Sequence, residues 1–263
     1  MLTRQFSSDL LYRDGYTVFS LSDRQSFENL CCEVRKVFTE VGAIDSADRQ
    51  DHRLFFEELH CASPFDRIDI NDTRVRVISA LASEKLSINT QIFQLVEAEV
   101  NSILGPDLLI QRGVNLVIQR PGDPDPSEPH RDFPANSAFE IVIWLPLSDC
   151  PVERTMYVVN FEESLSIAQR LRAGFYTNLE MFNSDVLSRS RPVPVAFGEV
   201  MMFLTPIFHG SIVNSSNGSR VSFNTRVKSF FSPSGSKDPF LFWEPLKASP
   251  VTKRGLQALK NEL

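Results

Sequence analysis

The hydrophobic periodicity of this 263-residue chain changes near residue 107, and this change constrains the fold more than any other feature. Before it, apolar residues recur at helical spacing over two segments, about 22–41 and 82–104. After it, short segments rich in β-forming residues alternate with proline and glycine. Helices followed by a run of short strands are typical of an α+β protein. We therefore predict a single domain, with N-terminal helices packed on a strand-built, barrel-like core.

The same pattern divides the chain 1–263 into helical support over 1–106, a core over 107–232 and a tail over 233–263. A short strand is expected just before the first helix, and a last helix ends the tail. The predicted strands are 16–21, 108–119, 138–145, 156–161, 199–204 and 221–231, and the last helix is about 252–263.

Two segments interrupt this plan. Residues 43–81 are charged and mixed in character, with a loop predicted at Asp45–His52. The segment 162–192 is polar, weakly helical and inserted between two strands. Insertions of this kind often cover a binding site, so it is a candidate lid.

Composition limits the possible partners. The formal net charge is −6 and the pI is about 5.3, which argues against nucleic acid but leaves room for an anionic small molecule held by buried arginines. The four cysteines form no CxxC pair and no zinc-type spacing, as expected for reduced thiols in the cytosol. No signal peptide and no apolar run of membrane-spanning length is present. We expect a soluble, cytoplasmic protein that binds small molecules but neither nucleic acid nor membrane; its oligomeric state cannot be read from the sequence.

The tripeptide His130-Arg131-Asp132 is compatible with two unrelated chemistries. It matches the start of a protein-kinase catalytic loop, in which the Asp accepts a proton from the substrate hydroxyl. That loop requires Asn at position 137, where this chain has Ser. The chain also lacks the glycine-rich loop, the Val-Ala-Ile-Lys strand and the Asp-Phe-Gly motif of kinases. The kinase interpretation is therefore rejected.

His130 and Asp132 also form two thirds of a 2-His-1-carboxylate site for non-haem Fe(II). Positions i and i+2 of an extended segment share a face, so both side chains can approach one ion. His209 follows a predicted strand and supplies the third ligand. His52 and His60 have no carboxylate at a matching spacing, which favours solvated or structural roles.

Arg220 lies eleven residues after His209, in the strand Arg-Val-Ser-Phe-Asn-Thr-Arg-Val. Alternation places its polar members on one face: Arg220, Ser222, Asn224 and Arg226. This face has two interpretations. It lies in solvent, or it lines a polar cavity in which an arginine binds a carboxylate through two parallel hydrogen bonds.

The ordered set His130-x-Asp132, His209 and Arg220-x-Ser222 resembles the Fe(II)/2-oxoglutarate-dependent dioxygenase superfamily over about residues 108–230. The stretches 140–147 and 209–222 are most similar to its phytanoyl-CoA-dioxygenase-like branch, and within it to oxygenases related to those of streptomycin biosynthesis. The resemblance implies a double-stranded β-helix (jelly-roll, cupin-like) core with N-terminal helices packed on it.

The resemblance also implies roles for these residues. His130, Asp132 and His209 would bind Fe(II), Arg220 would bind the 5-carboxylate of 2-oxoglutarate, and Ser222 would add a hydrogen bond. O2 would be consumed to hydroxylate a C–H bond of a small polar metabolite, such as a natural-product or sugar intermediate. Some members desaturate, cyclise or epimerise instead, and halogenation is disfavoured because Asp132 is present. The alternative is a non-catalytic jelly-roll protein that binds a metal or ligand.

Further residues are candidates with an open alternative. Asn115 and Gln119 are predicted to contact the cosubstrate or substrate, or else to lie on a solvated face. Four others are candidate substrate contacts: Arg131, Glu140, Trp144 and Arg226. The alternatives are that Arg131 points away from the metal, that Trp144 belongs to the core and that Arg226 lies on the surface. The alternative for Glu140 is that it holds in place another residue that faces the cosubstrate.

Overall fold

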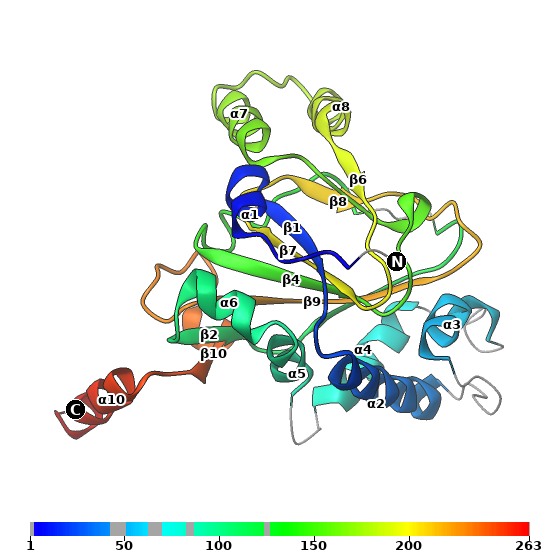
Figure 1. Ribbon diagram of the computed structural model, residues 1–263. Coiled ribbons are helices and arrows are strands. Elements are labelled where there is room, and N and C mark those ends of the chain that lie inside the picture. Colours follow the sequence, from blue (N-terminus) through cyan, green and yellow to red (C-terminus); the bar gives the residue numbers. More distant parts are fainter. Residues whose placement is uncertain (1–2, 43–50, 63–69, 83–86, 124–126, 263) are drawn as a thin grey trace.

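The molecule is built in layers (Figure 1). The computed structural model describes residues 3–42, 51–62, 70–82, 87–123 and 127–262. A helical layer covers one face of a larger sheet, a smaller sheet lies beyond the other face, and a helical pair packs outside the smaller sheet (Figure 1). All pairings among the described strands are antiparallel. The predicted α+β class is therefore confirmed as helices with two antiparallel sheets.

The larger sheet has the order β1-β7-β4-β9-β2-β10, and β3 also pairs with β9. Its strands are β1 (Tyr16–Ser20), β2 (Leu108–Gln111), β3 (Asn115–Gln119), β4 (Glu140–Pro146), β7 (Glu199–Leu204), β9 (Arg220–Ser229) and β10 (Trp243–Lys247). The smaller sheet has the order β6-β5-β8. It contains β5 (Met156–Val158), β6 (Arg191–Val193) and β8 (His209–Ser211).

The long strand β9 organises the larger sheet. It pairs with β4 along one edge, and with β3 and β2 in turn along the other. The single strand predicted over 108–119 is therefore two strands. The break lies at Gly113, whose φ of +67° is a conformation that glycine adopts without strain. Each half then pairs with its own part of β9.

Strict alternation along the strands separates two hydrophobic cores. Ile141 and Ile143 of β4 belong to the core shared with the helices, whereas Val142 and Trp144 belong to the core between the sheets. The face of β9 that points between the sheets is the polar one that carries Arg220. This polar strip needs a cavity or partners, because buried polar groups without either are costly.

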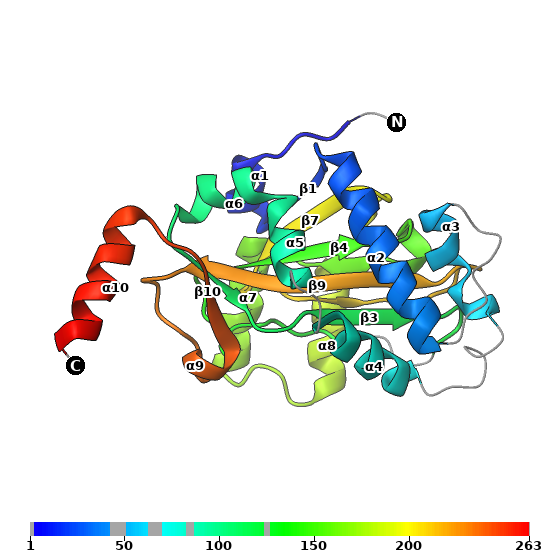
Figure 2. The same ribbon diagram turned by 90° about the horizontal axis from the view of Figure 1, so that it is seen from below.

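The helices α2 to α6 lie over the outer face of the larger sheet (Figures 1 and 2). They are α2 (Arg24–Gly42), α3 (His52–Glu57), α4 (Ile70–Ala82), α5 (Ile88–Gln94) and α6 (Glu97–Leu104). The predicted helix 82–104 is divided into α5 and α6 at Leu95 and Val96. Part of the mixed region 43–81 forms α3 and α4, and His52 is the first residue of α3. The rest of the loop predicted at 45–52 lies mostly outside the described residues.

The remaining helices flank this core. They are α1 (Ser8–Asp14), α7 (Phe161–Arg172), α8 (Leu179–Arg189), α9 (Pro239–Phe242) and α10 (Pro250–Glu262). The pair α7 and α8, which forms most of the 162–192 insertion, has its own small core with Val159 and Phe208. The predicted last helix is confirmed as α10, which projects from the body (Figure 2). Within the described ranges, no helix combines the length and apolar character needed to span a membrane.

Candidate metal centre and its cavity

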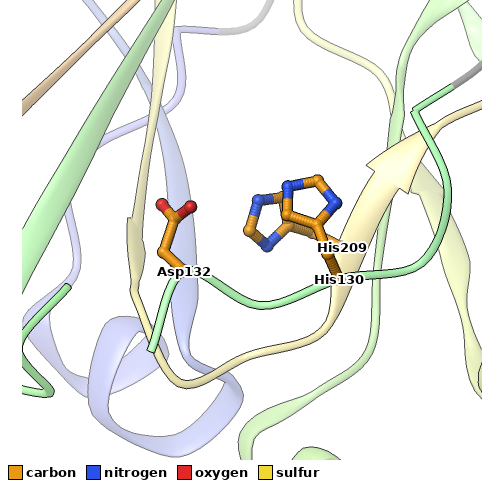
Figure 3. A group of neighbouring side chains, drawn as sticks. All are labelled: His130, Asp132 and His209. Carbon is orange, nitrogen blue, oxygen red and sulfur yellow. The ribbon is translucent and has the colours of Figure 1, made fainter. Parts of the chain in front are cut away.

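The three predicted metal ligands come together between the two sheets. The main chain of His130 pairs with that of His209 through two hydrogen bonds, N···O 3.0 and 2.8 Å, so these two residues lie side by side. Asp132 follows on the same segment. One donor atom from each of the three lies within 4.8 Å of the others. Figure 3 shows the two imidazoles together, with the carboxylate facing them.

Local hydrogen bonds indicate the tautomer of both imidazoles. The Nδ1 atom of His130 is 2.7 Å from the carbonyl oxygen of Glu128, and that of His209 is 3.1 Å from the carbonyl oxygen of Ile207. A carbonyl oxygen only accepts, so each Nδ1 carries the proton and donates it. Each Nε2 is then left with a free lone pair. This is the arrangement found at metal-binding histidines.

The charges of the cluster also suit a metal ion. Burial, reinforced by the neighbouring His130, lowers the pKa of His209 to about 4, so its imidazole is neutral near pH 7. Burial opposes ionisation of Asp132, but Arg226 and His209 outweigh this effect and lower the pKa of Asp132. The cluster therefore offers a neutral imidazole at His209 and a carboxylate at Asp132, beside the second imidazole at His130.

Arg226 holds that carboxylate in place. Its Nη2 and Nε atoms lie 2.6 and 3.1 Å from Oδ2 of Asp132, and its Nη1 donates to Oε1 of Gln111 at 2.9 Å. Neither contact with Asp132 uses Oδ1, which leaves that oxygen for a metal. Sequence reasoning proposed Arg226 as a substrate contact and missed Gln111. The pairing joins three distant segments, and only the polar face of the strand signalled it.

A cavity of about 680 Å³ opens over the three ligands, and we call it the inner cavity. It is bounded by β3, β9, the segment around the ligands and the start of α4. Its polar lining includes Asn115, Gln119, Arg220, Asn224, Arg226 and, from α4, Arg74. The described residues that line it include none from the insertion 162–192. The insertion therefore does not cover this cavity as the lid prediction required, and α4 lies at its edge instead.

Arg220 is a buried cation without a counter-charge. Its side chain is 2% exposed, and burial lowers its pKa. It donates to Oγ of Ser211 at 2.7 Å and to the carbonyl oxygen of Thr155 at 3.3 Å, while its Nε has no partner. Among the described residues no carboxylate pairs with it. The neighbouring Cys150 does not compensate, because burial raises the pKa of that thiol to about 12.

The polar atoms near Arg220 are also incompletely satisfied. Ser222 pairs in register with Val117, and its buried hydroxyl has no hydrogen-bond partner. Gln119 lies opposite Arg220 and donates to the carbonyl oxygen of Ile212 at 2.7 Å, which leaves its buried Oε1 free. Oε1 is an acceptor and suits a hydroxyl or water, not a carboxylate. Asn115 lines the cavity opposite Asn224, whose Oδ1 is also free.

The other candidates divide between the inner cavity and positions away from it. Trp144 belongs to the core between the sheets and also lines the inner cavity. Glu140 is buried and does not line it; its carboxylate accepts from Asn136 and from the backbone N–H of Ser137. Glu140 therefore orders the loop after the metal ligands and is not placed as a substrate contact. Arg131 points away from the inner cavity and lines a separate one.

Comparison with known proteins shows a shared fold. No protein-family model matches this chain, and no curated protein matches its sequence. Among solved structures, the non-heme monooxygenase ThoJ in a nickel complex aligns with a TM-score of 0.54 at 17% identity, covering 93% of this chain and 85% of that one. The non-heme alpha-ketoglutarate-dependent carbocyclase SnoK from nogalamycin biosynthesis aligns with a TM-score of 0.52 at 15% identity, covering 93% and 95%. At these identities the likeness concerns the fold alone.

Proposed function

We propose that this protein is an Fe(II)/2-oxoglutarate-dependent oxygenase that oxidises, by hydroxylation, a C–H bond of a small polar metabolite. The observation that carries the proposal is the buried Arg220, which pairs with no carboxylate in the described part of the chain and lines the same cavity as His130, Asp132 and His209. A buried, uncompensated cation is costly unless a bound anion neutralises it. A metal site and an anion site in one cavity suit a ligand that reaches both.

The ligand set fits Fe(II). Two neutral imidazoles and one carboxylate form the facial triad that binds non-haem Fe(II) and leaves further positions open. The hydrogen bonds occupy both Nδ1 atoms, and one ring nitrogen of each histidine lies within 4.8 Å of a carboxylate oxygen of Asp132. When bound, the iron would supply the redox chemistry with O2, which no side chain of the cluster provides.

The part of the inner cavity lined by Arg220 suits 2-oxoglutarate, which carries a 2-oxo acid at one end and a carboxylate at the other. We propose that the 2-oxo acid end binds at the metal and that the 5-carboxylate pairs with Arg220. Arg220 lines the inner cavity, and its Nε–H has no acceptor among the described residues. Ser222 is buried on the same face of β9 and is not a lining residue; we propose that its hydroxyl, which has no described partner, turns to the bound carboxylate. Asn115 and Gln119 line the same cavity and are proposed contacts of the substrate or cosubstrate. Trp144 lies on the cavity wall as a proposed apolar contact.

The reaction balances without any further oxidant. One O2 is reduced; one of its oxygen atoms enters succinate as 2-oxoglutarate loses CO2, and the other forms the hydroxyl of the oxidised C–H bond. The protein's residues bind and orient the reactants: Arg220 holds the cosubstrate, and Arg226 orients Asp132. The polar side chains that line the inner cavity, among them Arg74 and Asn224, favour a polar substrate.

Finer features belong to the same proposal. The two antiparallel sheets that flank the ligands are proposed to be a double-stranded β-helix over 107–232, supported by the helices of 1–106 and acting with the tail 233–263 as one unit. The similar fold of a non-heme monooxygenase and of an alpha-ketoglutarate-dependent carbocyclase supports this assignment. Membership of the phytanoyl-CoA-dioxygenase-like branch is part of the proposal.

The test measures succinate formed from 2-oxoglutarate in air, with and without Fe(II). Substrate-free succinate formation, with ascorbate added as the reductant in place of the substrate, is expected to depend on Fe(II) and to be lost in His209→Ala. Arg220→Leu should raise the 2-oxoglutarate concentration for half-maximal rate by about 30-fold or more, since truncating one partner of a buried charge pair typically costs about 2–5 kcal/mol. Metal binding without any succinate would instead support a non-catalytic binding protein. An unchanged 2-oxoglutarate requirement in Arg220→Leu would remove its assigned role.

A further inference from the structure

Arg131, the residue between two metal ligands, faces a second cavity. His130 and Asp132 line the inner cavity, whereas Arg131 lines a separate space of about 320 Å³ that we call the outer cavity. The two cavities share no lining residue. A volume of this size lies at the lower end of the range for small-molecule sites, about 300–1,000 Å³.

The lining of the outer cavity is mostly apolar, and the charged residues in it are cationic. The apolar walls come from the segment after Asp132, from α7 and from the end of β7, and include Phe133, Phe161, Leu165 and Leu204. The polar groups in its lining are Arg131, Gln169 and Arg172. No acidic residue is among the described residues that line it. A ligand for this cavity would place an apolar body against the apolar side chains and an anionic group near Arg131 and Arg172.

Both arginines lack a counter-charge within the described structure. Arg131 stacks on the rings of Phe133 and Phe208, with centroid distances of 5.2 and 5.6 Å, but pairs with no described carboxylate. Arg172, near the end of α7, likewise has no described ion pair.

Two other arginines, on the helices α7 and α8, do have a carboxylate partner. Arg170 and Arg189 both pair with Asp185, at 2.9 and 3.0 Å. Among the described residues, Asp185 therefore pairs with Arg170 and Arg189 but with neither arginine that lines the outer cavity. Two cations above an apolar hollow are complementary to an amphipathic anion.

We propose that the outer cavity binds a small amphipathic anion, with a carboxylate or phosphate head between Arg131 and Arg172 and an apolar body against Phe161 and Leu165. The site is independent of the proposed oxygenase reaction, because none of its lining residues belongs to the inner cavity. Arg131 is flanked by two proposed metal ligands, so the anion would bind directly behind the metal segment.

The test is calorimetric titration of the metal-free protein with octanoate and, separately, octyl phosphate. At least one should bind saturably, and the stronger of the two identifies the head group. Octanol and acetate should each bind about tenfold or more weakly, because octanol lacks the charge and acetate lacks the apolar body. Absence of saturable binding by both amphipathic anions would overturn the proposal.

Matched variants locate the binding. Arg172→Gln changes an exposed residue and should weaken binding of the anion about tenfold or more. Ala138→Trp, at an exposed lining position, should block the cavity while leaving both arginines in place. Arg254→Gln, an exposed arginine on α10, and Arg220→Leu, in the inner cavity, should leave the affinity within about twofold. Binding that is lost in Arg220→Leu but unchanged in Arg172→Gln would place the anion in the inner cavity and contradict the proposal.

Discussion

Two arginines of β9, Arg220 at its start and Arg226 six residues later, are in opposite electrostatic situations. Arg226 is 6% exposed and pairs with Asp132 at 2.6 Å, whereas Arg220 is 2% exposed and pairs with no described carboxylate. Both lie on the face of β9 that lines the inner cavity. The difference shows which charges the protein neutralises by itself and which it leaves for a ligand. Arg226 serves the protein's own carboxylate, and Arg220 is left for an external one.

The largest effect on the free energy of unfolding is expected from a change at Arg226. Arg226→Leu leaves Asp132 buried without its partner, and breaking a buried pair in this way typically costs about 3–5 kcal/mol of unfolding free energy. Denaturant unfolding of the metal-free protein measures this loss. Combining it with Asp132→Leu should restore most of the stability, because no unpaired charge then remains. A loss below about 1 kcal/mol in the single variant would show that the pair does not matter for the fold.

Replacing Arg220 should not lower the free energy of unfolding in the same way. Arg220→Leu removes a buried charge that no described carboxylate neutralises, which is favourable by several kcal/mol. It also removes two hydrogen bonds that the charged guanidinium donates to neutral acceptors, each worth about 1.5–3 kcal/mol. Its metal-free stability should therefore stay within about 1 kcal/mol of the wild type, or rise. In the nickel-loaded wild type, 2-oxoglutarate at 100 times its Kd should add about 2.7 kcal/mol, and this gain should vanish in the variant at the same concentration. Equal stabilisation of both proteins would contradict the assignment of Arg220.

Part of this comparison could be predicted from the sequence. Alternation along 220–227 placed both arginines on one polar face, because a strand sends successive side chains to opposite sides. It left open whether that face met solvent or a cavity. The answer depends on the smaller sheet lying beyond that face, and strand periodicity carries no information about which sheet packs where. The choice of Asp132 and Gln111 as partners of Arg226 depends on the same long-range packing.

Other differences have local or tertiary causes. The break at Gly113 follows from a positive φ that the β-rich composition of 108–119 did not signal. The candidate lid 162–192 was inferred from its polarity, yet α7 buries Ile167 and Ala168 in a small core outside the smaller sheet. Arg131 had two interpretations, and the i, i+2 geometry of its neighbours is consistent with the one observed: it points to the opposite side from His130 and Asp132.

A change at Ser222, two residues after Arg220, should have a smaller effect and should affect 2-oxoglutarate binding but not stability. The hydroxyl of Ser222 is buried and has no partner. Ser222→Ala should therefore leave the metal-free stability within about 0.5 kcal/mol. It should raise the 2-oxoglutarate requirement about fivefold, the effect of one hydrogen bond worth about 1 kcal/mol. Thr225→Ala is a matched control, because Thr225 is buried on the opposite face of β9 and also lacks a partner. A Ser222→Ala variant with wild-type kinetics would remove the hydroxyl from the cosubstrate site.

The central claim, that this cavity couples O2 to the decarboxylation of 2-oxoglutarate, is tested most directly by isotope labelling. The Fe(II)-loaded protein is incubated with 2-oxoglutarate and ascorbate, as the reductant in place of the substrate, under ¹⁸O2. The succinate is analysed by mass spectrometry, with His209→Ala as the control. The expected product is succinate that carries one ¹⁸O atom in its new carboxylate, at background levels in the control. Unlabelled succinate, or the same yield from His209→Ala, would contradict the claim.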